Sequence, residues 1–472
     1  MGQPAQVTVR PPQLKPSSKK RTRLWLLLIP LLCFLFISTP RLRLVGLGEE
    51  TQHSSPASPE PAFPDLPRHC AAIPPISSAV FEARRNTLAK RLHQLGAAAY
   101  IAEPSSSAAY YFNVSDAHWR LSERPLLFVV TPSVSGANRG RDGMSDAGDI
   151  SANVSILTPK FEATRAKLLP LSPSAYIQWA EEEDPFAVLF DALRLPSNST
   201  VFIDGNARLF VADGLQRALP HGQVQNAPLQ VVEIRERKTS EEINILKCAN
   251  EATLLAIRAT HKRMHIGMHE SDARALVAWA LAAVGLERAG CLTLFGENAA
   301  LPHGSGTNRV LQKEDFALFD CTGQLHGYWS DVTRTFALPD SSIPDDHLAI
   351  WHHVHAAQSL ARVATYPGAL TNHPDIVARA RLMLDGYGPY FTHRLGHGIG
   401  LDVHESPYLR GVPAAQATRI QTGHTFSDEP GVYIEGKVGV RLEDCMVVEQ
   451  GAPYATFLTA GVGGAALSPW EP

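Results

Sequence analysis

The feature that most restricts the fold of this chain is a pair of stretches in its last third, in which β-strand patterning is combined with acidic residues. In the first stretch, an apolar run over 316–319 ends at Asp320, and two glycines fall in the turn that follows. A second strand-like run over 328–336 then carries Asp331. This spacing predicts a β-hairpin that carries two carboxylates.

The second stretch repeats this arrangement. Glu429 is followed by a Pro-Gly pair and a short run over 432–434, and after a Glu-Gly-Lys turn a predicted strand over 438–448 carries Glu443. An isolated acidic residue is usually a solvated surface group. Two hairpins with two carboxylates each, however, would bury more negative charge than the few nearby Lys and Arg residues neutralise. We therefore expect bound cations to supply the counter-charge.

One histidine completes the set of candidate metal ligands. It lies in the segment HRLGHGIGLDVHE, whose three glycines disfavour a helix and favour loop and strand. Four carboxylates and one imidazole form an oxygen-rich set, which suits two divalent cations of the manganese, cobalt or zinc type rather than a thiolate site. The candidate ligands are Asp320, Asp331, His397, Glu429 and Glu443.

These motifs resemble those of the pita-bread metallopeptidases, the family of aminopeptidase P, prolidase and methionine aminopeptidase. The resemblance covers residues 241–460, with a looser match upstream. It implies an α+β fold with two parts. A C-terminal pita-bread domain, which is a curved antiparallel sheet flanked by helices, would follow a separate N-terminal creatinase-like α/β domain.

The same resemblance implies a role for each candidate ligand. Asp331 and Glu443 would bridge two divalent metal ions, with manganese favoured and cobalt or zinc as alternatives. Asp320 would complete one metal site, and His397 with Glu429 would complete the other. Two such ions would lower the pKa of a bridging water, and the resulting hydroxide would attack a peptide carbonyl.

Other residues outside the ligand set also have counterparts in this family. His303, in LFGENAALPHG, corresponds to a histidine that meets the substrate near the leaving group, and His393 corresponds to a substrate-binding group. His404 would stabilise the oxyanion, while Glu429 would carry a proton to the leaving nitrogen. Arg441 matches the arginine of the proline-directed branch.

The resemblance therefore implies a metallo-exopeptidase of the Xaa-Pro aminopeptidase or Xaa-Pro dipeptidase type. Its substrates would be peptides with proline in the second position. An Xaa-Pro bond lacks an N–H group, and proteases that need this donor cleave the bond poorly. Two alternatives stay open: a non-peptidase hydrolase on the creatinase fold, and a catalytically silent binding module that uses this fold. A homodimer is a further expectation from the family.

The N-terminal region differs in composition from the rest of the chain. Basic residues precede an apolar stretch over 24–38. This pattern predicts a membrane-directed segment, which we interpret as a single-pass signal anchor rather than a cleaved signal peptide. The basic flank would place the catalytic part in the lumen or outside the cell, with secretion as the alternative. The next residues are rich in Ser, Pro, Glu and Ala, which is typical of a flexible stalk.

The composition shifts predict four segments. They are a basic N-terminus with the signal anchor over 1–44, a linker over 45–76, the α/β domain over 77–233 and the catalytic domain over 234–465. The net charge is −3 and the charged fraction is 19%, so no nucleic-acid-binding surface is expected.

A helix is predicted where the catalytic domain begins. Thr239 and Glu242 have the spacing of a capping box, and apolar residues over 245–259 recur at helical spacing. A later helix candidate contains a histidine cluster. The adjacent His352 and His353 would point in different directions on a helix, so we interpret the cluster as helix surface rather than as a metal site.

The six cysteines show no repeated spacing. Cys33 lies in the apolar N-terminal stretch, which leaves five, so no disulfide scaffold is expected and at least one thiol should be free. Cys445 shares the strand face of Glu443, and we interpret it as a small buried apolar residue.

Overall fold

The structure is a computed structural model that describes residues 63, 66, 68–135 and 149–472. All the described residues belong to one compact unit. The predicted N-terminal segment over 1–44 and most of the predicted linker over 45–76 lie outside these residues.

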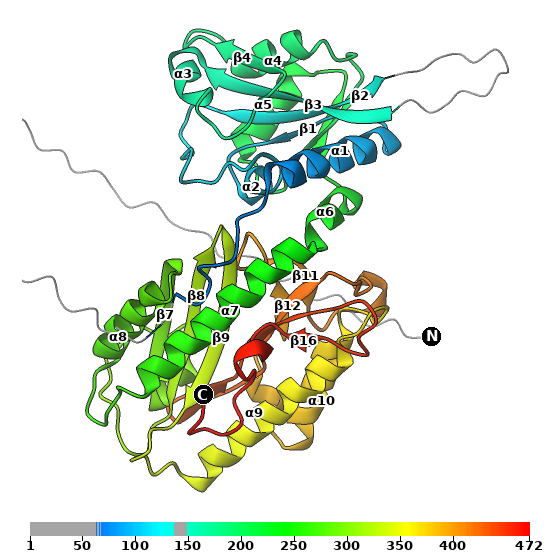
Figure 1. Cartoon of the computed structure of the whole chain (residues 1–472). Helices are drawn as coiled ribbons and strands as arrows, with labels where there is room; N and C mark the ends of the chain where they lie inside the picture. Colours follow the sequence, from blue (N-terminus) through cyan, green and yellow to red (C-terminus); the bar gives the residue numbers. More distant parts are fainter. Residues whose placement is uncertain (1–62, 64–65, 67, 136–148) are drawn as a thin grey trace, which may run out of the picture. The chain divides into compact units, whose positions relative to one another are not determined.

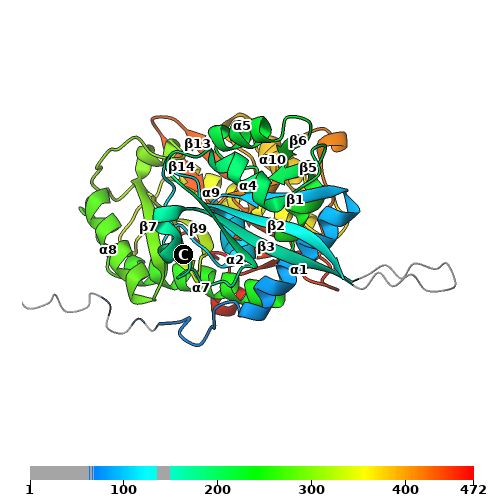
Figure 2. The ribbon, with the colours of Figure 1, turned by 90° about the horizontal axis from the view of Figure 1, so that it is seen from above.

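The first part of the described chain is built on a six-stranded sheet with the strand order β4-β3-β2-β1-β5-β6. The central strands β1, β2 and β3 run side by side in antiparallel register (Figure 2), whereas β4, β5 and β6 join in parallel. The strands are β1 (Ala97–Ala102), β2 (Leu127–Ser135), β3 (Asp149–Pro159), β4 (Ala175–Trp179), β5 (Thr200–Ile203) and β6 (Gln223–Asn226).

Helices cover both faces of this sheet (Figure 1). On one face, α1, α2 and α6 enclose a core that contains Tyr100, and on the other α4 and α5 enclose a core that contains Ile101. Adjacent strand residues thus alternate between the two cores, as the pleat requires. The helices are α1 (Ser78–Gln94), α2 (Ser106–Phe112), α3 (Ala163–Ala166), α4 (Pro185–Leu193), α5 (Leu209–Ala218) and α6 (Leu229–Glu236), with a 3₁₀ turn η1 (Lys160–Glu162).

The second part contains antiparallel sheets of three, five and two strands, in the orders β7-β8-β9, β11-β10-β12-β15-β16 and β13-β14. An isolated bridge between Thr333 of β9 and Glu443 links the first two sheets. The strands are β7 (Glu287–Phe295), β8 (Ala317–Leu325), β9 (Tyr328–Phe336), β10 (Gly396–Gly398), β11 (Glu405–Leu409), β12 (Thr425–Asp428), β13 (Gly431–Ile434), β14 (Val438–Arg441), β15 (Asp444–Val447) and β16 (Thr456–Phe457).

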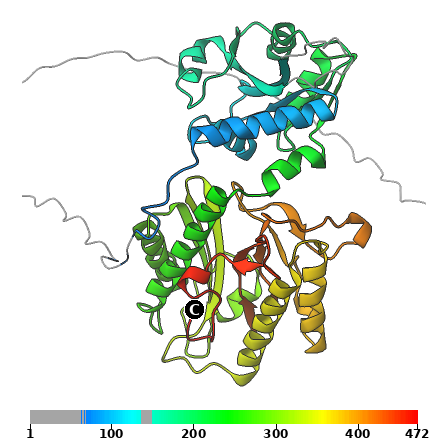
Figure 3. The ribbon, with the colours of Figure 1, turned by 45° about the vertical axis from the view of Figure 1, so that its right-hand side comes forward.

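Two helix pairs cover these sheets (Figure 3). The first pair, α7 and α8, shares a core with β7, β8 and β9, and the second pair, α9 and α10, packs on the strands that follow. The helices are α7 (Ser240–His261), α8 (Glu270–Ala283), α9 (Asp345–Ala364) and α10 (His373–Leu384), and the 3₁₀ turns are η2 (Gly296–Ala300), η3 (Gly388–Tyr390), η4 (Ala414–Gln416) and η5 (Ala460–Val462). The predicted α+β class, with a mixed sheet domain before antiparallel sheets and outer helices, is confirmed. The domain boundaries 77–233 and 234–465 stay a prediction.

The predicted capping box at the start of α7 is confirmed. The Thr239 side chain accepts a hydrogen bond from the backbone N–H of Glu242, and the Glu242 carboxylate accepts one from the backbone N–H of Thr239. Both orphan donors at the helix end are thereby satisfied. The capped helix then buries its apolar face against β9, which carries one of the candidate ligands.

Two disulfides occur in the described residues, although the irregular cysteine spacing gave no reason to expect them. Cys70 pairs with Cys248, 178 positions away, and Cys291 pairs with Cys321 across β7 and β8. Only the folded chain brings these partners together. The predicted free thiol is Cys445, which is buried as expected.

The predicted membrane anchor is contradicted. Among the residues that the structure describes, none of the helices combines the length and the apolarity that a membrane crossing needs. The predictions of a signal-anchored membrane protein, and of a lumenal, extracellular or secreted catalytic domain, are therefore wrong for this part of the chain. The stretch over 24–38, on which they rested, lies outside the described residues and is shorter than the ~20 residues of a spanning helix.

Candidate metal centre

The first predicted hairpin is formed by β8 and β9, and its register places both acidic residues on one face. Asp320 lies opposite Thr333, and Asp331 lies two positions before Thr333 on β9. Because residues two apart on a strand share a face, the two carboxylates are diagonal neighbours. Asp331 is 5% exposed, so its carboxylate is almost fully withdrawn from water.

The second pair of acidic residues lies where the chain changes sheets. Glu429 directly follows β12, and β13 and β14 then form the predicted hairpin. The predicted strand over 438–448 is interrupted: β14 ends at Arg441 and β15 begins at Asp444. Glu443, between them, forms the bridge to Thr333, and its Oε2 accepts a hydrogen bond of 2.7 Å from the Thr333 hydroxyl. The interruption thus places Glu443 beside the first hairpin.

His397 lies on the short strand β10, between two glycines that allow close packing. A Cβ added at Gly396 would lie 2.0 Å from the carbonyl oxygen of Ser427, so only glycine fits there. The His397 Nδ1 is 3.1 Å from the carbonyl oxygen of Gly398. A carbonyl can only accept, so Nδ1 carries the proton and Nε2 keeps its lone pair. This is the arrangement of metal-binding histidines.

The structure brings all five candidate ligands together. One group of ligand atoms comes from His397, Glu429 and Glu443, and another comes from Asp320, Asp331 and Glu443. Within each group the atoms lie within 4.8 Å of one another, and Glu443 belongs to both. The His397 Nε2 is 3.3 Å from Glu429 Oε1 and 3.7 Å from Asp331 Oδ2.

This concentration of acidic groups is electrostatically unfavourable without a cation. Burial, followed by repulsion from Glu443 and Asp320, raises the pKa of Asp331 well above its usual value. Burial also raises the pKa of Glu429 to about 7, and that of Glu443 well above its usual value. Glu443 Oε1 is buried and has no hydrogen-bond partner among the described residues. A buried, unpaired carboxylate oxygen of this kind fits a metal ion.

Arg441 contacts the centre directly, and Tyr433 links His393 to Arg441. Arg441 donates hydrogen bonds to Asp320 Oδ2 at 2.7 Å and to the Tyr433 hydroxyl at 2.9 Å. The His393 Nδ1 is 2.7 Å from the carbonyl of Arg394 and therefore carries the proton, so its Nε2 accepts from the Tyr433 hydroxyl at 2.8 Å. Burial lowers the pKa of His393 to about 4, which keeps the ring neutral. Sequence reasoning missed Tyr433, although it lies in the same EPGVYI motif as Glu429.

The two remaining predicted site residues lie at the exposed side of the centre. The His404 ring packs edge-on against that of His397, with 4.2 Å between the ring centroids, and a His404 nitrogen lies within 4.8 Å of the ligand atoms of Asp331 and His397. Burial lowers the pKa of His404 to about 4. His303 is exposed after η2, yet its charge contributes to the pKa of both His393 and His404.

The histidine cluster on α9 contributes to none of the candidate metal groups within the described ranges. His352 is exposed and His353 is 2.8 Å from Asp385 on the helix surface. The interpretation of this cluster as helix surface is therefore confirmed.

Comparisons with known proteins agree with this geometry. The sequence profile of metallopeptidase family M24 matches residues 244–450, which include every candidate ligand. An uncharacterized peptidase of Schizosaccharomyces pombe is 34% identical over 397 residues, which is 83% of each chain. A protein named Xaa-Pro dipeptidase from Lactobacillus helveticus is 32% identical over 65% of this chain and 83% of its own.

A solved structure supports the same assignment. The crystal structure of a dipeptidase from Mycobacterium ulcerans has a TM-score of 0.70 and 26% identity to this chain. The similarity covers 82% of this chain and 97% of that one, so it extends over both the mixed sheet and the antiparallel sheets. The chain belongs to metallopeptidase family M24.

Proposed function

We propose that the chain is a dinuclear metallopeptidase that cleaves Xaa-Pro bonds. The observation that carries this proposal is the convergence of five ligand-type side chains, from four separate segments, on one buried point. Glu443 would hold both cations, since it belongs to both ligand groups, and Asp331 would do the same, since its ligand atom also groups with that of His397. Asp320 would complete one site and His397 the other.

Glu429 has two roles in this proposal. It would complete the second cation site together with His397, and it would also carry the proton. When bound, two divalent cations supply a hydroxide at neutral pH and polarise the scissile carbonyl. An oxygen-rich ligand set of this kind favours manganese, with cobalt or zinc as alternatives.

The protein groups around the centre have the properties that peptide hydrolysis requires. Glu429, whose Oε1 lies 3.3 Å from His397 Nε2, would take up a proton and pass it to the leaving nitrogen. His404 lies beside His397 on the exposed side, where it would donate to the developing oxyanion. His303 and His393 would contact the substrate, and the Tyr433 hydroxyl at 2.8 Å would hold His393 in one orientation.

Relatives support the choice of Xaa-Pro peptides as substrates. The Lactobacillus helveticus relative and one from Pyrococcus furiosus are both named Xaa-Pro dipeptidase. Arg441 is also present, as in the proline-directed branch of the family. A dipeptidase and an aminopeptidase would share this centre and differ in the peptide length that they accept. Homodimer formation stays a prediction.

A comparison of three substrates tests the proposal. The manganese-loaded chain is offered Gly-Pro, Ala-Pro-Ala and Met-Ala-Ser, and the released residue is identified by mass spectrometry. We expect release of glycine or alanine from the proline peptides. Cleavage of Gly-Pro alone would assign a dipeptidase, and cleavage of Ala-Pro-Ala would assign an aminopeptidase. Cleavage of the methionyl peptide alone would refute the proposed specificity.

Replacement of Arg441 by lysine is expected to lower kcat/KM for the preferred substrate about 10- to 100-fold. A lysine cannot hold Asp320 and Tyr433 at once, because it lacks the planar fork of the guanidinium group. The measurement is steady-state kinetics at saturating manganese. Arg410→Lys, at an exposed position, is the matched control and should keep full activity. Equal rates for the two variants would show that Arg441 does not position the site.

A further inference from the structure

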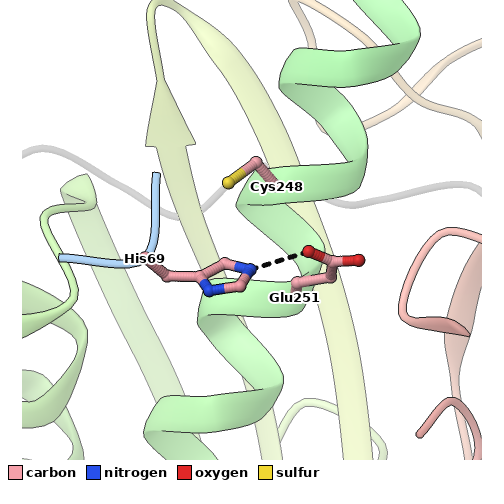
Figure 4. Close-up of side chains that lie close together, drawn as sticks. All are labelled: His69, Cys248 and Glu251. Atoms are coloured by element: carbon pink, nitrogen blue, oxygen red, sulfur yellow. Dashed lines mark hydrogen bonds and ion pairs between the residues drawn. The ribbon is translucent and has the colours of Figure 1, made fainter. Parts of the chain in front are cut away.

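A second group of ligand-type side chains lies apart from the proposed dinuclear centre, where the segment before α1 meets α7. The His69 Nε2 is 2.7 Å from Glu251 Oε2, and the Cys248 sulfur belongs to the same group of ligand atoms, all within 4.8 Å of one another. Figure 4 shows the three side chains together at one side of α7. Cys70, the neighbour of His69 in sequence, is bonded to Cys248.

Two short segments thus supply a group of three ligand-type side chains, and Cys70, which lies outside that group, is tied to it through its bond to Cys248. Cys248 and Glu251 are three positions apart on α7, which places them on one face of the helix. Asn250 and Thr253 lie on another face of the helix. The Asn250 side chain accepts a hydrogen bond from the backbone N–H of Asp331, and the Thr253 hydroxyl is hydrogen-bonded to the Ser330 hydroxyl. The group therefore lies on a different side of α7 from Asn250 and Thr253, which contact β9.

We propose that reduction of the Cys70–Cys248 disulfide converts this group into a zinc site. A dithiol reductant would donate two electrons and two protons to break the S–S bond, and would itself become a disulfide. Binding of Zn²⁺ would then displace the two thiol protons to solvent. The ligands would be the two thiolates, the His69 imidazole and the Glu251 carboxylate.

The chemistry of these ligands distinguishes the two sites. Two thiolates, one imidazole and one carboxylate form a tetrahedral sulfur-containing set of the kind that Zn²⁺ prefers, whereas the dinuclear centre offers no thiolate. Both cysteines are 6% exposed, while His69 and Glu251 are half-buried, so the site is enclosed but reachable by an ion. Cys70 also lines a cavity of about 280 Å³ together with Arg68, Ile73 and Val284. A small dithiol would approach the disulfide from this cavity.

Cobalt spectroscopy of the full-length chain tests the proposal. The dinuclear centre is first loaded with manganese, the protein is reduced with a dithiol, the dithiol is removed without oxygen, and Co²⁺ is titrated in. We expect a thiolate-to-cobalt charge-transfer absorption in the near ultraviolet that corresponds to one thiolate-bound cobalt per chain. The unreduced protein should not show this absorption, because the dinuclear centre, where cobalt can replace manganese, offers no thiolate. Absence of the absorption after reduction would overturn the proposal, and so would unfolding of the reduced protein, seen by circular dichroism.

Variants assign the absorption to individual ligands. His69→Ala and Glu251→Gln leave the disulfide intact, and each should weaken cobalt binding by at least about tenfold, since loss of even an outer-shell partner costs that much. Cys291→Ser with Cys321→Ser, and separately Cys445→Ser, should retain the absorption, because these thiols lie elsewhere. An absorption that survives in His69→Ala and Glu251→Gln but disappears in either control would place the thiolate ligands at another site.

Discussion

Replacing Glu443 with glutamine is expected to lower kcat/KM by more than about a thousandfold. The reason is that Glu443 belongs to both candidate ligand groups, so its loss disturbs both cations. Lewis-acid stabilisation by a bound metal contributes several kcal/mol to the transition state, and each 1.4 kcal/mol corresponds to about a tenfold change in rate. The measurement is kcat/KM on the preferred Xaa-Pro peptide at saturating manganese. His397→Ala should show a similar loss.

The same substitution is expected to stabilise the metal-free protein. Burial and repulsion from Glu429 raise the pKa of Glu443, so its charge is unfavourable in the fold when no cation is present. Glutamine removes that charge at nearly constant volume. Thermal unfolding in chelator should therefore show a higher Tm for Glu443→Gln. Glu435→Gln, an exposed change on the β13–β14 hairpin, is the control and should alter neither activity nor Tm. An active Glu443→Gln variant would refute a shared ligand role.

Removal of the metal ions is expected to lower the free energy of unfolding, and more so at pH 8 than at about pH 5.5. A cation present at a thousandfold excess over its Kd stabilises the fold by about 4 kcal/mol per site. At pH 8 the metal-free protein must bury several charged carboxylates close together. At about pH 5.5 protons already neutralise part of this charge and compete with the cation.

The direction in which pH changes the stability of the metal-free protein follows from the shifted pKa of Glu429. In the metal-free fold the pKa of Glu429 is raised from 4.5 to about 7, mainly by burial, while in the unfolded chain this group titrates near its usual value. The folded state therefore binds more protons between these two values. The contribution of Glu429 to the free energy of unfolding is therefore fully present below pH 4.5, falls as the pH rises, and is lost above about pH 7. Bound cations should cancel this loss.

Thermal unfolding with and without chelator, recorded across this pH range, measures the effect. The gap between the manganese-loaded and metal-free Tm should widen as the pH rises through about 7. A gap that is constant with pH, or that narrows, would show that the acidic residues do not hold the cations. The double variant Asp331→Asn with Glu443→Gln serves as the reference, because its metal-free Tm should vary less with pH.

The candidate site could be predicted from the sequence because each ligand lies in a local pattern with its own physical meaning. The alternation of strand residues around Asp331 fixes which face its side chain occupies, and the turn glycines fix the hairpin that brings Asp320 beside it. Likewise, the glycines beside His397 indicated a backbone that approaches its neighbours closely, which Gly396 does.

Other features depend on contacts that a local pattern does not contain. The strand-like pattern over 438–448 hid the point at which the chain leaves β14 for β15, and the bridge to Thr333 decides that position. The Cys70–Cys248 disulfide joins residues 178 positions apart, so spacing alone could not reveal it. Tyr433 is recognisable as a partner of Arg441 only once the β13–β14 register is known.

The most direct test of the central claim is anomalous diffraction from crystals of the manganese-loaded protein, recorded at the manganese absorption edge. Two anomalous peaks are predicted between the β8–β9 hairpin and β10, with Glu443 and Asp331 in contact with both and His397 in contact with one. A single peak, or peaks that contact neither Glu443 nor Asp331, would contradict the proposal that these residues hold a pair of catalytic cations.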